Sequence, residues 1–132
     1  MKIILRLLTF ITLALVTACA GAPAHIEENL APAEYFQRAQ EAMGSRDDYK
    51  TALVYYTTFL ERFPEDTQRV VEAEYEIAFI HYVQGDFITA EKEFRALLDR
   101  YNQPEAEALP KWPRVLAEKL LIEIAIKKEN ED

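Results

Sequence analysis

Residues 48–63 read DYKTALVYYTTFLERF, and residues 86–101, thirty-eight positions later, read DFITAEKEFRALLDRY. Five of the sixteen pairs are identical and five more are similar in kind, so the chain contains an internal repeat. In both copies the apolar residues recur at i, i+3, i+4 and i+7, which is the spacing of an amphipathic α-helix. We expect both helices to be capped by an aspartate, Asp48 or Asp86, and to end before a proline, Pro64 or Pro104.

A further helical stretch precedes each copy of the repeat. Residues 32–43 begin with Pro32, which suits a first helical turn, and residues 67–84 are followed by Gly85, which favours a left-handed helix cap. Two helical hairpins are therefore predicted. Residues 113–128 carry another apolar stripe, and an irregular link with one helical turn is expected at 102–112. With three glycines and no strand-like alternation, the predicted fold is all-α, with a single domain at 32–132.

The hairpins resemble tetratricopeptide units, whose second helix follows the pattern Gly-Asp-Tyr-x-x-Ala-x-x-x-Tyr. The second copy matches as Gly85-Asp86-Phe87-x-x-Ala90-x-x-x-Phe94, and the first as Asp48-Tyr49-x-x-Ala52-x-x-x-Tyr56. The resemblance covers residues 34–101 and implies two repeats, with residues 113–128 as a C-terminal capping helix. The long offset and the Phe63-Pro64 pair before an acidic linker are similar to the tetratricopeptide lipoproteins that help to assemble outer-membrane β-barrels.

Residues 1–18 have the organisation of a lipoprotein signal peptide. Lys2 and Arg6 supply a positive start, residues 7–16 supply a short apolar run, and small residues follow. The stretch Leu15-Val16-Thr17-Ala18-Cys19 resembles a bacterial lipobox, in which the cysteine is acylated and becomes the N-terminus. Two other cuts, within 18–20 and 20–22, satisfy the small-x-small rule of an ordinary signal peptidase and would release a soluble protein.

We expect lipid on Cys19, which is the only cysteine of the chain. Residues 19–31 show no periodicity and are predicted to form a flexible tether. The protein would then be a membrane-anchored lipoprotein that faces the periplasm. Ala20 stands where an aspartate would resemble an inner-membrane retention signal, so the outer membrane is favoured.

The resemblance also implies a partner-binding surface, because the first helix of each tetratricopeptide unit lines the concave face. In the second unit the candidate partner-binding residues are Glu72, Tyr75, Phe79, Tyr82 and Val83. Two interpretations stay open: a groove for an envelope protein or peptide, or core packing against the tether or the terminal helix. In the first unit the turn at 44–47 carries an extra residue, so the register is ambiguous and Gln37 and Glu41 are the candidates.

Charge and motif content argue against other function classes. The formal net charge of −8 becomes about −10 once Lys2 and Arg6 leave with the signal, which disfavours nucleic-acid binding. No Cys-x-x-Cys, His-Glu-x-x-His or glycine-rich phosphate loop occurs, so we expect no metal, no cofactor and no enzymatic activity. His81 is expected to be structural. Trp112 is expected to cover the end of the core, with anchoring of a partner or of the membrane interface as the alternative.

The leading hypothesis is a lipid-anchored, non-catalytic protein–protein interaction scaffold of the bacterial envelope, with a role in outer-membrane protein assembly implied by the resemblance. The alternative is a ligand-binding accessory lipoprotein of a transport or peptidoglycan-processing system.

Overall fold

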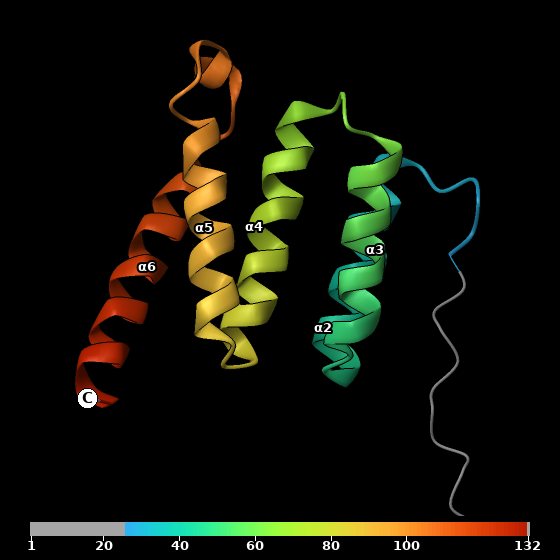
Figure 1. Cartoon of the computed structure of the whole chain (residues 1–132). Helices are drawn as coiled ribbons and strands as arrows, with labels where there is room; N and C mark the ends of the chain where they lie inside the picture. The colour runs from blue at the N-terminus through green and yellow to red at the C-terminus, as the bar shows by residue number, and fades with distance from the viewer. Residues whose placement is uncertain (1–25, 132) are drawn as a thin grey trace, which may run out of the picture.

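The computed structural model describes residues 26–131, and over this range the protein is all-helical, as predicted. The α-helices are α2 (Pro32–Arg46), α3 (Tyr49–Arg62), α4 (Thr67–Val83), α5 (Phe87–Arg100) and α6 (Lys111–Glu131). A 3₁₀ turn, η1 (Pro104–Ala108), lies in the link between α5 and α6, where one helical turn was expected. Successive helices run in opposite directions and stand side by side (Figure 1). The predicted signal peptide and Cys19 lie outside the described residues.

Three of the helices, α3, α4 and α5, begin at an aspartate that caps them with its side chain. The Asp48 carboxylate accepts a hydrogen bond from the backbone N–H of Thr51 at 3.0 Å, and Asp86 accepts one from Thr89 at 3.1 Å. Asp66 caps α4 in the same way. Each carboxylate satisfies a backbone donor that has no partner within its helix. The two predicted N-caps, Asp48 and Asp86, are therefore confirmed.

The helices form two pairs, α2 with α3 and α4 with α5. In each pair, a residue in the left-handed conformation ends the first helix. Gly85 has a φ of +82°, which confirms the predicted cap, and Asp47 takes the corresponding position after α2 with a φ of +50°. The sequence pattern ended the first helix at residue 43, three residues short of its end in the structure. At the other end of the body, α6 begins at Lys111 and includes Pro113, because the amides of a first turn need no partner within the helix.

The central helix α4 buries two opposite faces. Val70 and Ala73 lie on one face and join a core with side chains of α2 and α3. Tyr75 and Ala78 lie on the other face and join a second core with side chains of α5 and α6. Each fully buried large apolar side chain contributes roughly 1.5–3 kcal/mol, so α4 stabilises both halves of the body.

The end of the predicted tether lies against the first helix pair. Leu30 is buried and Ile26 packs against the same core. The Arg62 guanidinium donates hydrogen bonds to the backbone carbonyls of Glu27 and Glu28, at 3.3 and 2.8 Å. The flexible tether predicted for 19–31 therefore does not extend over residues 26–31, while residues 19–25 lie outside the described part of the chain.

The terminal helix α6 packs on α5 and α4 through an inner face that includes Ala117 and Ile124. Its outer face carries three apolar side chains that are each more than half exposed, Val115, Ile122 and Ile126. A terminal repeat usually presents a polar outer face, so α6 is more apolar outside than expected of a capping helix. None of the helices within residues 26–131 is long and apolar enough to cross a membrane.

Alanine at the two glycines of the helical body should shift stability in opposite directions. Gly85→Ala places a side chain at a left-handed φ and should lower the free energy of unfolding by about 1–2 kcal/mol. Gly44 lies within α2 with open space where a Cβ would stand, so Gly44→Ala should raise it by roughly 0.5–1 kcal/mol. Urea denaturation measures both changes. A gain of stability in Gly85→Ala would contradict the left-handed cap.

Candidate functional site

Three of the predicted partner-binding residues form a row of stacked rings along α4. The ring centroids of Tyr75 and Phe79 are 6.1 Å apart, and those of Phe79 and Tyr82 are 6.3 Å apart. The planes within each pair are tilted by only 12° and 21°. Tyr75 is 7% exposed, whereas Phe79 and Tyr82 are half-buried. The row therefore passes from the core toward the surface.

The terminal helix covers part of this row. The Trp112 ring stands edge-on to Tyr75 with centroids 5.1 Å apart, and its Nε1 donates to the Glu72 carboxylate at 3.3 Å. The Tyr82 hydroxyl donates to the Glu123 carboxylate of α6 at 2.8 Å. Tyr75 is thus a core residue, and Glu72 and Tyr82 are engaged by α6. Trp112 covers the core at Tyr75, as expected, and remains 40% exposed.

The middle ring of the row, Phe79, also lines a shallow pocket. Phe79 and Val83 of α4 line an apolar pocket of about 320 Å³ together with residues of α2 and the first residue of α3. Val83 is 41% exposed at its edge. The remaining lining residues are Gln40, Met43, Gly44 and Tyr49. We call this site the α2–α4 pocket.

The turn after α2 explains which of its residues face the pocket. The backbone N–H of Asp86 donates to the carbonyl of His81, five residues back, whereas that of Asp48 donates to Ala42, six residues back. The first turn therefore contains one extra residue. As a result, α2 and α4 correspond with an offset of 39 residues, whereas α3 and α5 keep the offset of 38.

With this register, α2 and α4 contribute corresponding residues to the α2–α4 pocket. Gln40 corresponds to Phe79 and Gly44 to Val83. The candidates Gln37 and Glu41 do not line the pocket, and they are exposed and hydrogen-bonded to each other at 2.9 Å. The extra residue was visible in the sequence, but its effect on the register was not.

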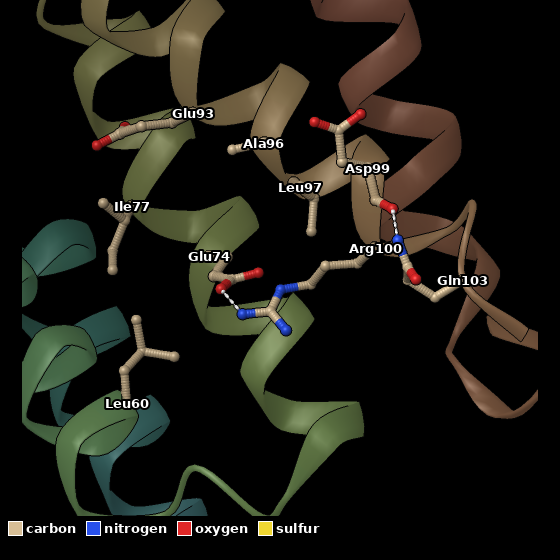
Figure 2. Close-up of a pocket in the computed structure, with 9 residues that line it drawn as sticks. All are labelled: Leu60, Glu74, Ile77, Glu93, Ala96, Leu97, Asp99, Arg100 and Gln103. Atoms are coloured by element: carbon tan, nitrogen blue, oxygen red, sulfur yellow. Dashed lines mark hydrogen bonds and ion pairs between the residues drawn. The ribbon is translucent and has the colours of Figure 1, made fainter. Parts of the chain in front are cut away.

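A larger cleft, of about 470 Å³, lies between α3 and α5 with α4 as its floor (Figure 2). We call it the α3–α5 cleft. Leu60 of α3, Ile77 of α4 and Leu97 of α5 give it an apolar interior, and Ala96 lies on the α5 wall. None of the residues that line this cleft was predicted from the sequence as a site residue. The available signal was the arginine that the two copies of the repeat share, Arg62 and Arg100.

Charged groups surround the α3–α5 cleft. The Arg100 guanidinium crosses from α5 and donates to one oxygen of the Glu74 carboxylate, while the second Glu74 oxygen is buried and has no hydrogen-bond partner (Figure 2). Glu93 and Asp99 add two further carboxylates, so the lining is acidic. Glu93 also contacts His81 Nδ1 at 2.7 Å, so His81 links α4 to α5.

A partly buried carboxyl lies on α4 near two buried tyrosines. Burial, and secondarily the charge of Glu72, raises the pKa of Glu76. Burial and the charge of Glu76 raise the pKa of Tyr75 to about 12, and they raise the pKa of Tyr56 as well. The Tyr56 hydroxyl is buried without a hydrogen-bond partner. Ionised Glu76 therefore stands in surroundings that disfavour its charge.

Neutralising this carboxyl should stabilise the protein at neutral pH. Folding raises the pKa of Glu76, so protonation of this carboxyl stabilises the folded state. This stabilisation is fully present below about pH 4.5, the ordinary pKa of glutamate, and is lost as the pH rises through the raised pKa. Glu76→Gln should therefore unfold at higher urea concentration than wild type at pH 7, and this advantage should shrink as the pH falls toward 4.5. An advantage that stays constant with pH would contradict the assignment.

Within residues 26–131, no three histidine, cysteine or acidic side chains come together in a way that could hold a metal ion. Two of the lined surfaces of the structure include residues of α4, the α2–α4 pocket and the α3–α5 cleft, and they differ in charge and in the other elements that form them.

The chain is similar to an uncharacterized protein of Treponema pallidum (strain Nichols), with 33% identity over 95 residues. The match covers 70% of this chain but only 38% of the relative, so the chain spans about two fifths of the relative's length. No protein-family model matches the sequence. No solved structure matches it either.

Proposed function

We propose that this chain is a lipid-anchored scaffold of the bacterial cell envelope that holds a protein partner and catalyses no reaction. The observation that carries the proposal is the α2–α4 pocket, in which corresponding residues of two helix pairs form one apolar surface. Repeated helices that line one surface are suited to binding an extended partner. The relative from Treponema pallidum, a bacterium, supports the bacterial setting.

In this proposal the two helix pairs are tetratricopeptide-like units. The small residues of the repeat pattern, Ala52 and Ala90, are fully buried, which allows the helices of each pair to approach closely. The aromatic residues of the pattern, Tyr56 and Phe94, are also fully buried. These four positions support the resemblance. A role in outer-membrane protein assembly follows from the resemblance and belongs to the same proposal.

The proposed anchor would keep the helical body close to the lipid. A lipid on Cys19 stands only seven positions before Ile26, the first residue held by the body. Seven residues span at most about 25 Å when fully extended. The scaffold would therefore present its partner near the membrane surface, on the periplasmic side, with the outer membrane favoured by Ala20.

Site-specific cross-linking tests the binding surface. A photo-reactive amino acid at Val83, in cells that make the protein, should give a discrete adduct with one protein partner. The same amino acid at Ile88, which is 78% exposed on α5 outside the pocket, should not. Met43→Arg should remove the Val83 adduct, because it places a charge in the apolar pocket.

Two results would argue against a protein-binding scaffold. Equal adducts at Val83 and Ile88 would indicate non-specific proximity. A small molecule that copurifies with the wild-type protein and is lost in Met43→Arg would favour the ligand-binding accessory instead.

Mass spectrometry of the mature N-terminus tests the anchor. The expected product begins at Cys19 and carries acyl chains, and Cys19→Ser should move the protein from the membrane fraction to the soluble fraction. An unmodified N-terminus at residue 21 or 23 would contradict lipidation and show that an ordinary signal peptidase made the cut.

A further inference from the structure

The first helix pair holds a short segment of this chain in a defined site. Arg62 Nη1 donates to the carbonyls of Glu27 and Glu28, and to the Tyr35 hydroxyl at 2.7 Å. Arg38 lies 3.8 Å from the Glu27 carboxylate. The segment 26–30 is not helical, and its apolar ends pack against the first core. The body therefore binds a short acidic segment through backbone carbonyls, apolar side chains and basic groups.

The α3–α5 cleft occupies the corresponding place on the second helix pair. The residues of the two sites are related by the offset of 39 between α2 and α4 and by the offset of 38 between α3 and α5. Arg38 and Arg62, which contact segment 26–30, and Tyr35, which accepts a hydrogen bond from Arg62, correspond to three residues that line the cleft: Arg38 to Ile77, Arg62 to Arg100, and Tyr35 to Glu74. As Arg62 donates to Tyr35 in the first pair, Arg100 donates to Glu74 in the second. The cleft thus has the framework of a segment-binding site.

The charge of the two sites is opposite. Two arginines receive the acidic segment on the first pair, whereas Glu74, Glu93 and Asp99 line the cleft and its one arginine already pairs with Glu74. The second oxygen of Glu74 is buried without a donor, which is costly until a donor reaches it. Among the acidic residues that line the cleft, Glu93 contacts the His81 ring through Nδ1. A matching segment would carry a cation.

We propose that the α3–α5 cleft binds a short, non-helical segment of a partner protein that carries lysine or arginine. Its apolar side chains pack on Leu60, Ile77 and Leu97, and its cation meets the Glu74 carboxylate, while Asp99 adds negative charge at the rim of the cleft. Segment 26–30 of a second copy fits poorly, because its two glutamates would face these carboxylates. This site goes beyond the proposed function, since it lies on a different face of α4 from the α2–α4 pocket.

A pair of peptides based on the chain's own segment tests the charge preference. The probe is AHIKKNLA, which is residues 24–31 with Glu27→Lys and Glu28→Lys, and the matched control is the native AHIEENLA. Fluorescence anisotropy with the full-length chain should show the lysine peptide binding at least about tenfold more tightly, with affinity that falls as salt rises. Equal binding of the two peptides would overturn the proposal.

Substitutions in the cleft separate site binding from general attraction to an acidic protein. Ala96→Gln puts a larger side chain on the exposed wall of the cleft and should abolish binding of the lysine peptide. Ala125→Gln, at an exposed alanine of α6, should leave binding unchanged. Asp99→Asn, which keeps its shape, should weaken binding about threefold to tenfold.

Unchanged binding in both Ala96→Gln and Asp99→Asn would refute the site, and circular dichroism confirms that each variant is folded. None of these residues lines the α2–α4 pocket, so this result is independent of the cross-linking at Val83.

Discussion

The arrangement of the body depends on the burial of two opposite faces of α4. Val70 and Ala73 require cover from the first helix pair, whereas Tyr75 and Ala78 require cover from α5 and α6. Because burial of each large apolar side chain contributes roughly 1.5–3 kcal/mol, neither half of the molecule can leave α4 without exposing a core. Only two narrow strips of α4 remain to line open surface. The α2–α4 pocket lies on one strip and the α3–α5 cleft on the other.

A single extra residue in the turn after α2 decides what faces the first of these surfaces. Successive residues of an α-helix point about 100° apart, so a shift of one residue brings a different side chain to the same face. Gln40 and Gly44, rather than Gln37 and Glu41, therefore meet the residues of α4. An insertion of this kind changes the chemistry of a repeated surface while the helices and their packing stay in place.

The two helix pairs also show how one framework serves opposite charges. Arg62 and Arg100 hold corresponding positions, but Arg62 binds a backbone segment and Arg100 pairs with a carboxylate. Replacement of Tyr35 by its counterpart Glu74 accounts for this difference, because a carboxylate neutralises the guanidinium that a phenol leaves available. In the proposed cleft site, the side chains at these corresponding positions set the charge of the segment that is accepted.

The sequence by itself determined the features that depend on near neighbours. The apolar spacing gave the all-α class, and Asp48, Asp86 and Gly85 marked helix ends correctly, because capping involves backbone groups within a few residues. The end of α2, where the left-handed cap is Asp47 and not a glycine, and both ends of α6 were displaced by two or three residues. The identification of a signal peptide and of Cys19 rests on the sequence and stays a prediction.

The tertiary structure alone decided which predicted site residues are open. Tyr75 could line a groove or a core until Trp112, far along the chain, was placed against it. The attachment of residues 26–31 likewise depends on Arg62, and the α3–α5 cleft exists only where α3, α4 and α5 meet. These outcomes come from contacts between distant residues, whose partners no local pattern of apolar spacing or capping specifies.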